Sequence, residues 1–290
     1  MSSTELVLAP PATSDPALRP VTAVPDVGRA DTAGPPVAEP VRSVFPNLLR
    51  SEWAKLRTVR STYWSLAAAF AAMVGLGAII SATQTGSHTG SFDPVSISLS
   101  GVLLAQLAIG VLGVLLVTSE YSTGMIRSTS IAAPQRREVI ASKAAIFGLV
   151  AFVVGTVASF ITFFVGQSML GSRGVSLGAA GALRSVIGVG LYLGLLGVFA
   201  VGLGTIIRNG AGAIAALFGL LLVLPAVLQA LPTSLRDSID KFLPGNAGQA
   251  IFHTVNDTTS LSPWLGIAVF AIYAAASLGI GLILVRRRDA

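Results

Sequence analysis

A polar, basic segment interrupts an otherwise very apolar chain between residues 119 and 142. It begins near Glu120 and ends with an arginine pair, Arg136 and Arg137, followed by Glu138. Fixed charges beside a helix end suit an electrostatic contact with a soluble protein. Catalysis would need a nucleophile beside a base, or a set of metal ligands, and no such set is recognisable in the chain. The segment therefore indicates a docking surface.

Other motifs that carry chemistry are missing from the sequence. A P-loop needs a lysine directly after a glycine, and none of Lys55, Lys143 and Lys241 follows one. HExxH and GxSxG do not occur, cysteine is absent, and the two histidines, His88 and His253, are far apart. We therefore expect no catalytic residue, no metal and no cofactor in this chain.

The composition predicts an all-α integral membrane protein. The chain of 290 residues is 53% hydrophobic and 11% charged, with a mean hydropathy of +0.78, whereas soluble domains carry about 25% charged residues. The net charge of +6 is best explained by basic residues on the cytoplasmic side of a membrane. We expect membrane lipid as a partner and no nucleic acid.

Six stretches are long and apolar enough to cross a bilayer, which requires roughly 20 residues per helix. They are Thr62–Thr83, Val95–Thr118, Ile140–Ser168, Ala182–Ile207, Ala211–Leu231 and Trp264–Val285. None holds an acidic residue in its middle, where Gln106, serines and threonines are the main polar groups. A coupling-ion site is therefore not expected, and energy for any transport would have to come from outside the chain.

The basic residues predict that both termini lie in the cytoplasm. With the N-terminus inside, 15 of the 19 lysines and arginines fall on the cytoplasmic side. The four on the outer side are Arg173, Arg184, Arg236 and Lys241. Two cytoplasmic ends also require an even number of spans, which agrees with six.

The predicted organisation has four parts. They are a disordered, proline-rich cytoplasmic tail (1–42), an interfacial amphipathic helix (43–61), a six-helix transmembrane domain (62–285) and a short cytoplasmic tail (286–290). The transmembrane domain includes a cytoplasmic loop (119–139) and a long outer loop (232–263), whose short amphipathic pieces are predicted to lie against the outer interface. These pieces would either form a lid or exit gate or have no role beyond filling the loop.

The interfacial helix allows two interpretations. Its apolar residues recur at helical spacing, and Trp53 would sit at headgroup depth. The helix is either a membrane anchor alone or also part of a partner-docking surface that includes Trp53, Lys55 and Arg57. Glu52 interrupts the apolar face, which favours a protein contact there.

Two features bear on how the spans pack. Gly190 and Gly194 form a GxxxG pair in the fourth span, which suits either packing within the chain or a subunit interface. Pro225 is predicted to kink the fifth span.

Three stretches of the chain resemble the membrane subunit of ABC-2-type transporters, particularly the actinobacterial type. They are the interfacial helix Ser51–Thr62, the loop from Glu120 to Arg137 and the outer-loop stretch Leu243–Ala250. With the six-span layout, the resemblance covers about residues 43–288, and the proline-rich tail lies outside it.

The resemblance implies the permease of an ATP-driven exporter in the bacterial plasma membrane. Two such subunits would pair, as a homodimer or heterodimer, and each would dock a separate cytoplasmic ATPase that binds ATP and Mg. By similarity, the coupling element between Glu120 and Glu138 would begin with Glu120, Gly124 and Arg127 and end with Pro134, Arg136 and Arg137. The path between two subunits, lined by apolar, serine and threonine side chains, would favour amphipathic or lipid-like cargo.

Alternatives remain both for single residues and for the function of the whole chain. Arg136 and Arg137 could serve topology alone, and Glu120 could be a solvated or helix-capping carboxylate. The whole chain could be a non-transporting scaffold or sensor subunit, which would need no ATPase. An intramembrane enzyme is the third alternative, and the lack of a nucleophile–base or metal set argues against it.

Overall fold

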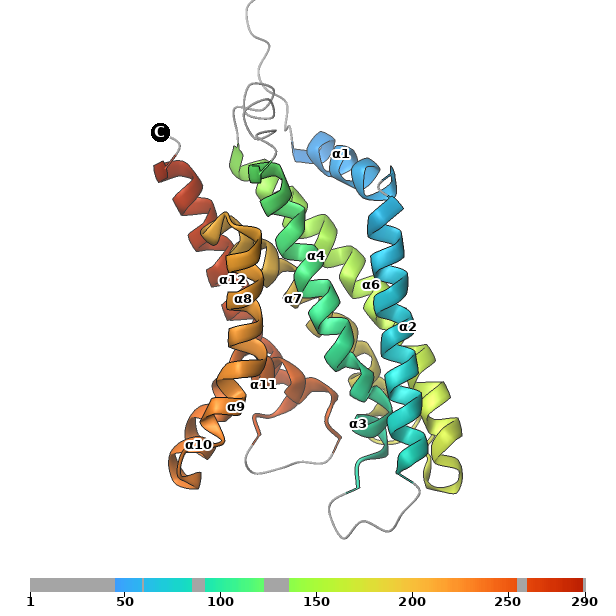
Figure 1. The fold of residues 1–290 in the computed structure, drawn as a ribbon. Helices are drawn as coiled ribbons and strands as arrows, with labels where there is room; N and C mark the ends of the chain where they lie inside the picture. The colour runs from blue at the N-terminus through green and yellow to red at the C-terminus, as the bar shows by residue number, and fades with distance from the viewer. Residues whose placement is uncertain (1–44, 59, 85–91, 123–135, 255–259, 289–290) are drawn as a thin grey trace, which may run out of the picture. The chain divides into compact units, whose positions relative to one another are not determined.

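The computed structural model describes residues 45–58, 60–84, 92–122, 136–254 and 260–288 (Figure 1). All regular elements in these ranges are helical. They are α1 Phe45–Thr58, α2 Arg60–Thr83, α3 Pro94–Ser98, η1 Leu99–Gly101, α4 Val102–Ser122, α6 Arg136–Leu170, η2 Gly171–Arg173, α7 Ala182–Ile207, α8 Gly210–Phe218, η3 Gly219–Val223, α9 Leu224–Leu228, α10 Thr233–Ile239, η4 Asp240–Phe242, α11 Pro244–Gln249, η5 Ala250–Phe252 and α12 Pro263–Arg288. The predicted tail 1–42 lies outside the described residues.

Within the described ranges, six helical segments are long and apolar enough to span a membrane. They are Thr62–Thr83, Pro94–Tyr121, Arg137–Arg173, Ala182–Ile207, Gly210–Leu228 and Pro263–Arg287. The first and fourth have the bounds expected from the sequence, and the others differ by a few residues at their ends. The chain is thus an all-α membrane protein with six spanning helices, as predicted.

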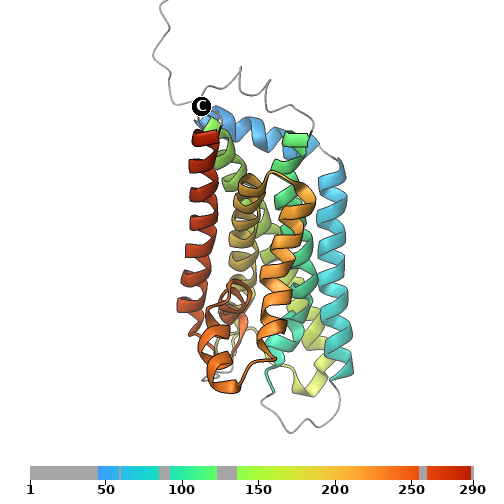
Figure 2. The same cartoon turned by 60° about the vertical axis from the view of Figure 1, so that its left-hand side comes forward.

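The helix ends sort to two sides of the bundle. Figures 1 and 2 show α1, the end of α4, the beginning of α6 and the C-terminal end of α12 together at one end. The short helices α3, α10 and α11 lie at the opposite end. The first group carries most of the described basic residues, so the positive-inside rule predicts that it lies on the cytoplasmic side.

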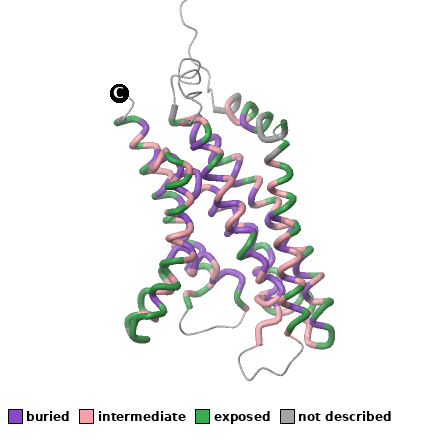
Figure 3. The backbone as a smooth tube through the Cα atoms, viewed as in Figure 1, coloured by how far each residue is buried: buried purple, intermediate pink, exposed green. Residues whose placement is uncertain are grey.

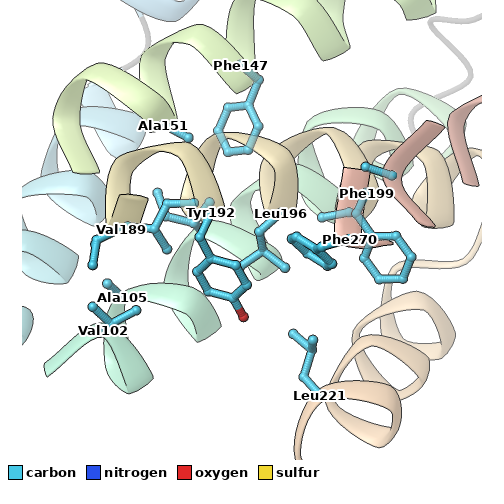
Figure 4. Close-up of a cluster of buried hydrophobic side chains, with 14 of the residues drawn as sticks. Val102, Ala105, Phe147, Ala151, Val189, Tyr192, Leu196, Phe199, Leu221 and Phe270 are labelled. Atoms are coloured by element: carbon cyan, nitrogen blue, oxygen red, sulfur yellow. The ribbon is translucent and has the colours of Figure 1, made fainter. Parts of the chain in front are cut away.

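Helix α7 is the centre of the bundle. It packs against α4, α6 and α12. Of the most apolar 18-residue stretch of this span, 72% is buried inside the protein, compared with 22% for the first span and 17% for the fifth span. Figure 3 shows the buried positions concentrated on the inner helices. Figure 4 shows Tyr192 and Leu196 of α7 among core side chains from four other elements.

The glycine pair of α7 packs within the chain. A Cβ added at Gly190 would collide with Thr156 of α6, and one at Gly194 would lie 3.0 Å from the carbonyl oxygen of Gly148. Of the two interpretations of this pair, the structure supports intramolecular packing of α7 against α6.

The fifth span is irregular where Pro225 was predicted to kink it. A π-helical turn, η3, separates α8 from α9. Proline has no backbone N–H, and its ring displaces the carbonyl four residues earlier, here that of Leu221. The helix accommodates the proline by widening over this turn.

The outer loop divides into two parts that behave differently. Leu235, Ile239 and Phe242 of α10 and η4 are exposed, as expected for pieces at the outer interface. The prediction is wrong for α11 and η5, because Ile251 is completely buried and Phe252 nearly so. The reason lies in glycines that sequence patterning did not pair. A Cβ at Gly188 would lie 2.6 Å from Ile251, and the missing side chain lets η5 enter the bundle beside α7.

Candidate functional site

The cytoplasmic ends of α4 and α6 carry opposite charges. Glu120 lies in the last turn of α4, where the partial negative charge of the helix C-terminus disfavours a carboxylate. Lys143 lies two turns inside α6, and no other charged residue follows Glu138 in that helix. Each side chain would be unfavourable alone in its position, so the fold must bring them together.

Lys143 contacts two carboxylates at once. Its Nζ donates a hydrogen bond to Oε1 of Glu120 at 2.6 Å and to Oε2 of Glu52 at 2.8 Å. Lys143 and Glu52 are each 3% exposed, and the side chain of Glu120 is 16% exposed. We call Glu52, Glu120 and Lys143 the Lys143 triad.

The triad sets the position of three elements more than it adds stability. Removing an ion from water costs several kcal/mol, which offsets most of the attraction between buried charges. The ammonium group has three donors in tetrahedral directions, so the two carboxylates must approach from defined sides. The triad therefore holds α1, α4 and α6 in one arrangement at the cytoplasmic end.

A second contact fixes the end of α4 on its other side. The guanidinium carbon of Arg208 lies 5.1 Å from the centre of the Tyr121 ring, a distance typical of a cation–π contact. Arg208 ends α7 in the left-handed conformation, with a φ of 59°. The side chain of Asn209 then accepts a hydrogen bond from the backbone N–H of Gly212 and begins α8. The end of α4 is thus tied to α1 and α6 through Glu120 and to the α7–α8 turn through Tyr121.

The predicted coupling residues fall into three groups. Glu120 is in the triad, Trp53 on α1 is 44% exposed, and Arg137 at the start of α6 is exposed. Lys55, Arg57 and Arg136 lie on α1 and α6, but their side chains are not among the described ones. Gly124, Arg127 and Pro134 lie outside the described residues.

Sequence reasoning missed the pairing of Lys143 with Glu52. Glu52 had suggested a contact with a protein partner, but its carboxylate is buried against Lys143 of the same chain. Because the carboxylate of Glu120 also binds Lys143, Glu120 is more than a solvated or helix-capping carboxylate. One signal was available. A lysine inside an apolar span requires a counter-charge, and between residues 43 and 285 the acidic residues on the cytoplasmic side are Glu52, Glu120 and Glu138.

A polar cluster in the interior ties α11 to the bundle. The hydroxyl of Tyr192 donates to Oε1 of Gln106 at 2.6 Å, and Nε2 of Gln249 approaches the same oxygen at 3.3 Å. These residues come from α7, α4 and α11. Their uncharged groups can orient helices, and they include no carboxylate or imidazole for ion coupling.

The outer end has its own connection between distant segments. Asp93 accepts hydrogen bonds from the backbone of Val95 and Ser96 and so caps α3. The same carboxylate accepts from the backbone N–H of Thr254 at 2.7 Å and from its hydroxyl at 2.6 Å. In the described part of the chain, no three His, Asp or Glu side chains gather as metal ligands do.

Comparison with family models adds an independent assignment. A model described as "ABC-2 family transporter protein" matches residues 48–223, more than half of the chain. A search of curated proteins finds no match. The matched region begins in α1 and ends at η3, so it contains the whole Lys143 triad. The chain belongs to the ABC-2 transporter family and is a multi-pass membrane component of a transporter, located in bacteria in the plasma membrane.

Proposed function

We propose that this chain is the permease subunit of an ATP-driven exporter and that segment 119–139 couples it to a separate cytoplasmic ATPase. The observation that carries the proposal is the Lys143 triad, in which one buried ammonium binds carboxylates of α1 and α4 within 2.8 Å. Both helices that flank the segment are thereby joined to the interfacial helix α1. A displacement of the segment by a partner would move three elements together.

The packing of α7 extends this mechanical path into the membrane. Both α4 and α6 pack along α7, which in turn packs against α12. Closely packed helices transmit rigid-body motion because their interfaces do not deform continuously. Closure of two ATPase subunits on ATP would thus tilt α4 and α6, and the core around α7 would follow.

ATP and Mg belong to the partner in this proposal. Since none of the three lysines follows a glycine, the chain lacks the lysine of a P-loop. The energy must therefore arrive through a protein contact. Exposed Arg137 at the first turn of α6 is well placed for that contact.

The translocation path would form between two permease subunits, identical or related. The first and fifth spans have the least buried surface. In the most apolar 18-residue stretch of each, 22% of the first span and 17% of the fifth span is buried. A second subunit would cover part of this surface. Apolar walls with serine and threonine hydroxyls suit amphipathic cargo moving outward.

Co-purification tests the proposed coupling. The full chain would be purified from its native membrane in mild detergent, as wild type and as Arg137→Glu. Arg236→Glu is a matched charge reversal on the outer side, where the Arg236 side chain is 37% exposed. We expect a P-loop ATPase to co-purify with the wild type and Arg236→Glu and to be reduced at least tenfold with Arg137→Glu, the effect of roughly 1.4 kcal/mol. Absence of any ATPase from the wild-type preparation would favour the scaffold alternative.

A further inference from the structure

An apolar groove of about 490 Å³ lies between α2 and α6, next to Trp53 of α1. Its walls come from Leu66, Ala67 and Phe70 of α2 and from Phe147, Val150 and Val154 of α6. The volume lies within the range of ~300–1,000 Å³ that ligand sites occupy. None of its lining residues belongs to the Lys143 triad.

The groove changes in polarity along its length. Its cytoplasmic end is bordered by Trp53, Thr62 and Tyr63, which each combine an apolar body with a polar tip, and its other side chains are purely apolar. From Thr62 to Phe70 the rise of an α-helix covers about 12 Å. A single leaflet contributes about half of the ~30 Å hydrocarbon core, so the groove lies within the depth of one leaflet.

Basic residues stand beside the polar end. Arg50 precedes Trp53 by three positions on α1, and Arg60 precedes Tyr63 by three positions on α2. Residues three apart on a helix are neighbours on its surface, and both arginines are exposed. A ligand in the groove therefore meets aromatic tips and positive charge at the cytoplasmic surface and hydrocarbon further in.

We propose that the groove binds one acyl chain of an anionic phospholipid of the cytoplasmic leaflet, with the headgroup at Arg50 and Arg60. Charge complementarity selects an anionic headgroup, and the polarity gradient matches a phospholipid from headgroup to chain. The bound lipid fills the space between α1 and the α2–α6 pair. It thereby supports α1, which carries Glu52 of the Lys143 triad.

Trp53 provides a direct reporter. The chain has three tryptophans, so a variant with Trp64→Phe and Trp264→Phe leaves Trp53 as the only one. This full-length variant would be reconstituted into phosphatidylcholine vesicles containing increasing fractions of dibrominated phosphatidylglycerol or dibrominated phosphatidylcholine. Bromine quenches tryptophan fluorescence only at short range, so half-maximal quenching reports the occupancy of the groove.

We expect quenching by the anionic lipid at about a 25-fold lower fraction than by the zwitterionic lipid, the factor for two basic residues at an anionic surface. Arg60→Gln should bring this ratio towards one without affecting the fold, because Arg60 is exposed. Ala67→Phe should fill the groove and reduce quenching by both lipids. Ala68→Phe is the matched control, since Ala68 is exposed on the same helix and does not line the groove.

Two results would overturn the proposal. Equal quenching by both lipids, unchanged in Ala67→Phe, would mean that the groove holds only bulk lipid. No quenching by either lipid would mean that protein covers the groove. The chain lacks cysteine, so disulfide formation between two copies of Ala67→Cys in native membranes would then identify a second copy as the occupant.

Discussion

Lys143 is the residue whose replacement tests the physical account of the triad most sharply. At an effective dielectric constant of about 20, a unit charge pair at the observed 2.8 Å attracts by roughly 6 kcal/mol. The hydration lost on burial offsets much of this. Lys143→Met would remove the buried ammonium that both Glu52 and Glu120 contact and leave two like charges close together, so we expect a loss of about 3–5 kcal/mol in stability.

The assay is thermal unfolding of the full chain in detergent, followed by tryptophan fluorescence. Lys143→Met should unfold at a clearly lower temperature than the wild type. Lys241→Met, a loss of a lysine on the outer side, serves as the control and should unfold near the wild type. The triple variant Glu52→Gln, Glu120→Gln, Lys143→Met should recover much of the loss, since it neutralises all three members of the triad. If Lys143→Met and Lys241→Met unfold alike, or if the triple variant is no better than Lys143→Met, the reasoning is refuted.

Three further predictions concern the rest of the bundle. Gly190→Ala should destabilise the α6–α7 contact by about 1–3 kcal/mol, whereas Gly75→Ala, with no atom within 4 Å of the added Cβ, should not; thermal unfolding of both variants compares them. Tyr192→Phe should lower the free energy of unfolding by about 1–3 kcal/mol, because Gln106 loses the hydrogen-bond donor of a buried hydroxyl. In thermal unfolding, a Gln106→Met, Tyr192→Phe double variant should recover part of this loss. Asp93→Ala should lower the free energy of unfolding by about 1 kcal/mol through loss of the α3 cap. It should also speed proteolysis of the outer loop, and unchanged cleavage would contradict the role of Asp93 in holding that loop.

The six spans were predictable because each is a continuous apolar run whose length is set by the bilayer. The fourth span shows this best, since it begins and ends at the expected residues, Ala182 and Ile207. Its small-residue pair also indicated close packing, but periodicity alone did not identify α6 as the partner. Thr156 and Gly148, which meet Gly190 and Gly194, became identifiable only from the structure.

The centre of the candidate site could be predicted only in part. Glu120 was expected at the start of the coupling segment, but its partner Lys143 and the distant Glu52 were not expected to meet. Glu52 and Lys143 are 91 residues apart, and their pairing depends on how far α1 lies along α6, which apolar patterning does not specify. The burial of η5 escaped prediction for a similar reason. Ile251 fits against Gly188, and neither residue indicates the other in sequence.

Site-directed cross-linking would test the central claim, that the cytoplasmic ends of α4 and α6 engage an ATPase, most directly. Because the chain has no cysteine, Arg137→Cys introduces a single reactive thiol at the start of α6 in native membranes. Ser168→Cys, exposed near the opposite end of the same helix, is the matched control. We predict that Arg137→Cys cross-links to a protein with a P-loop and that Ser168→Cys does not. Equal labelling of both positions, or cross-linking of Arg137→Cys only to proteins without a P-loop, would contradict the account.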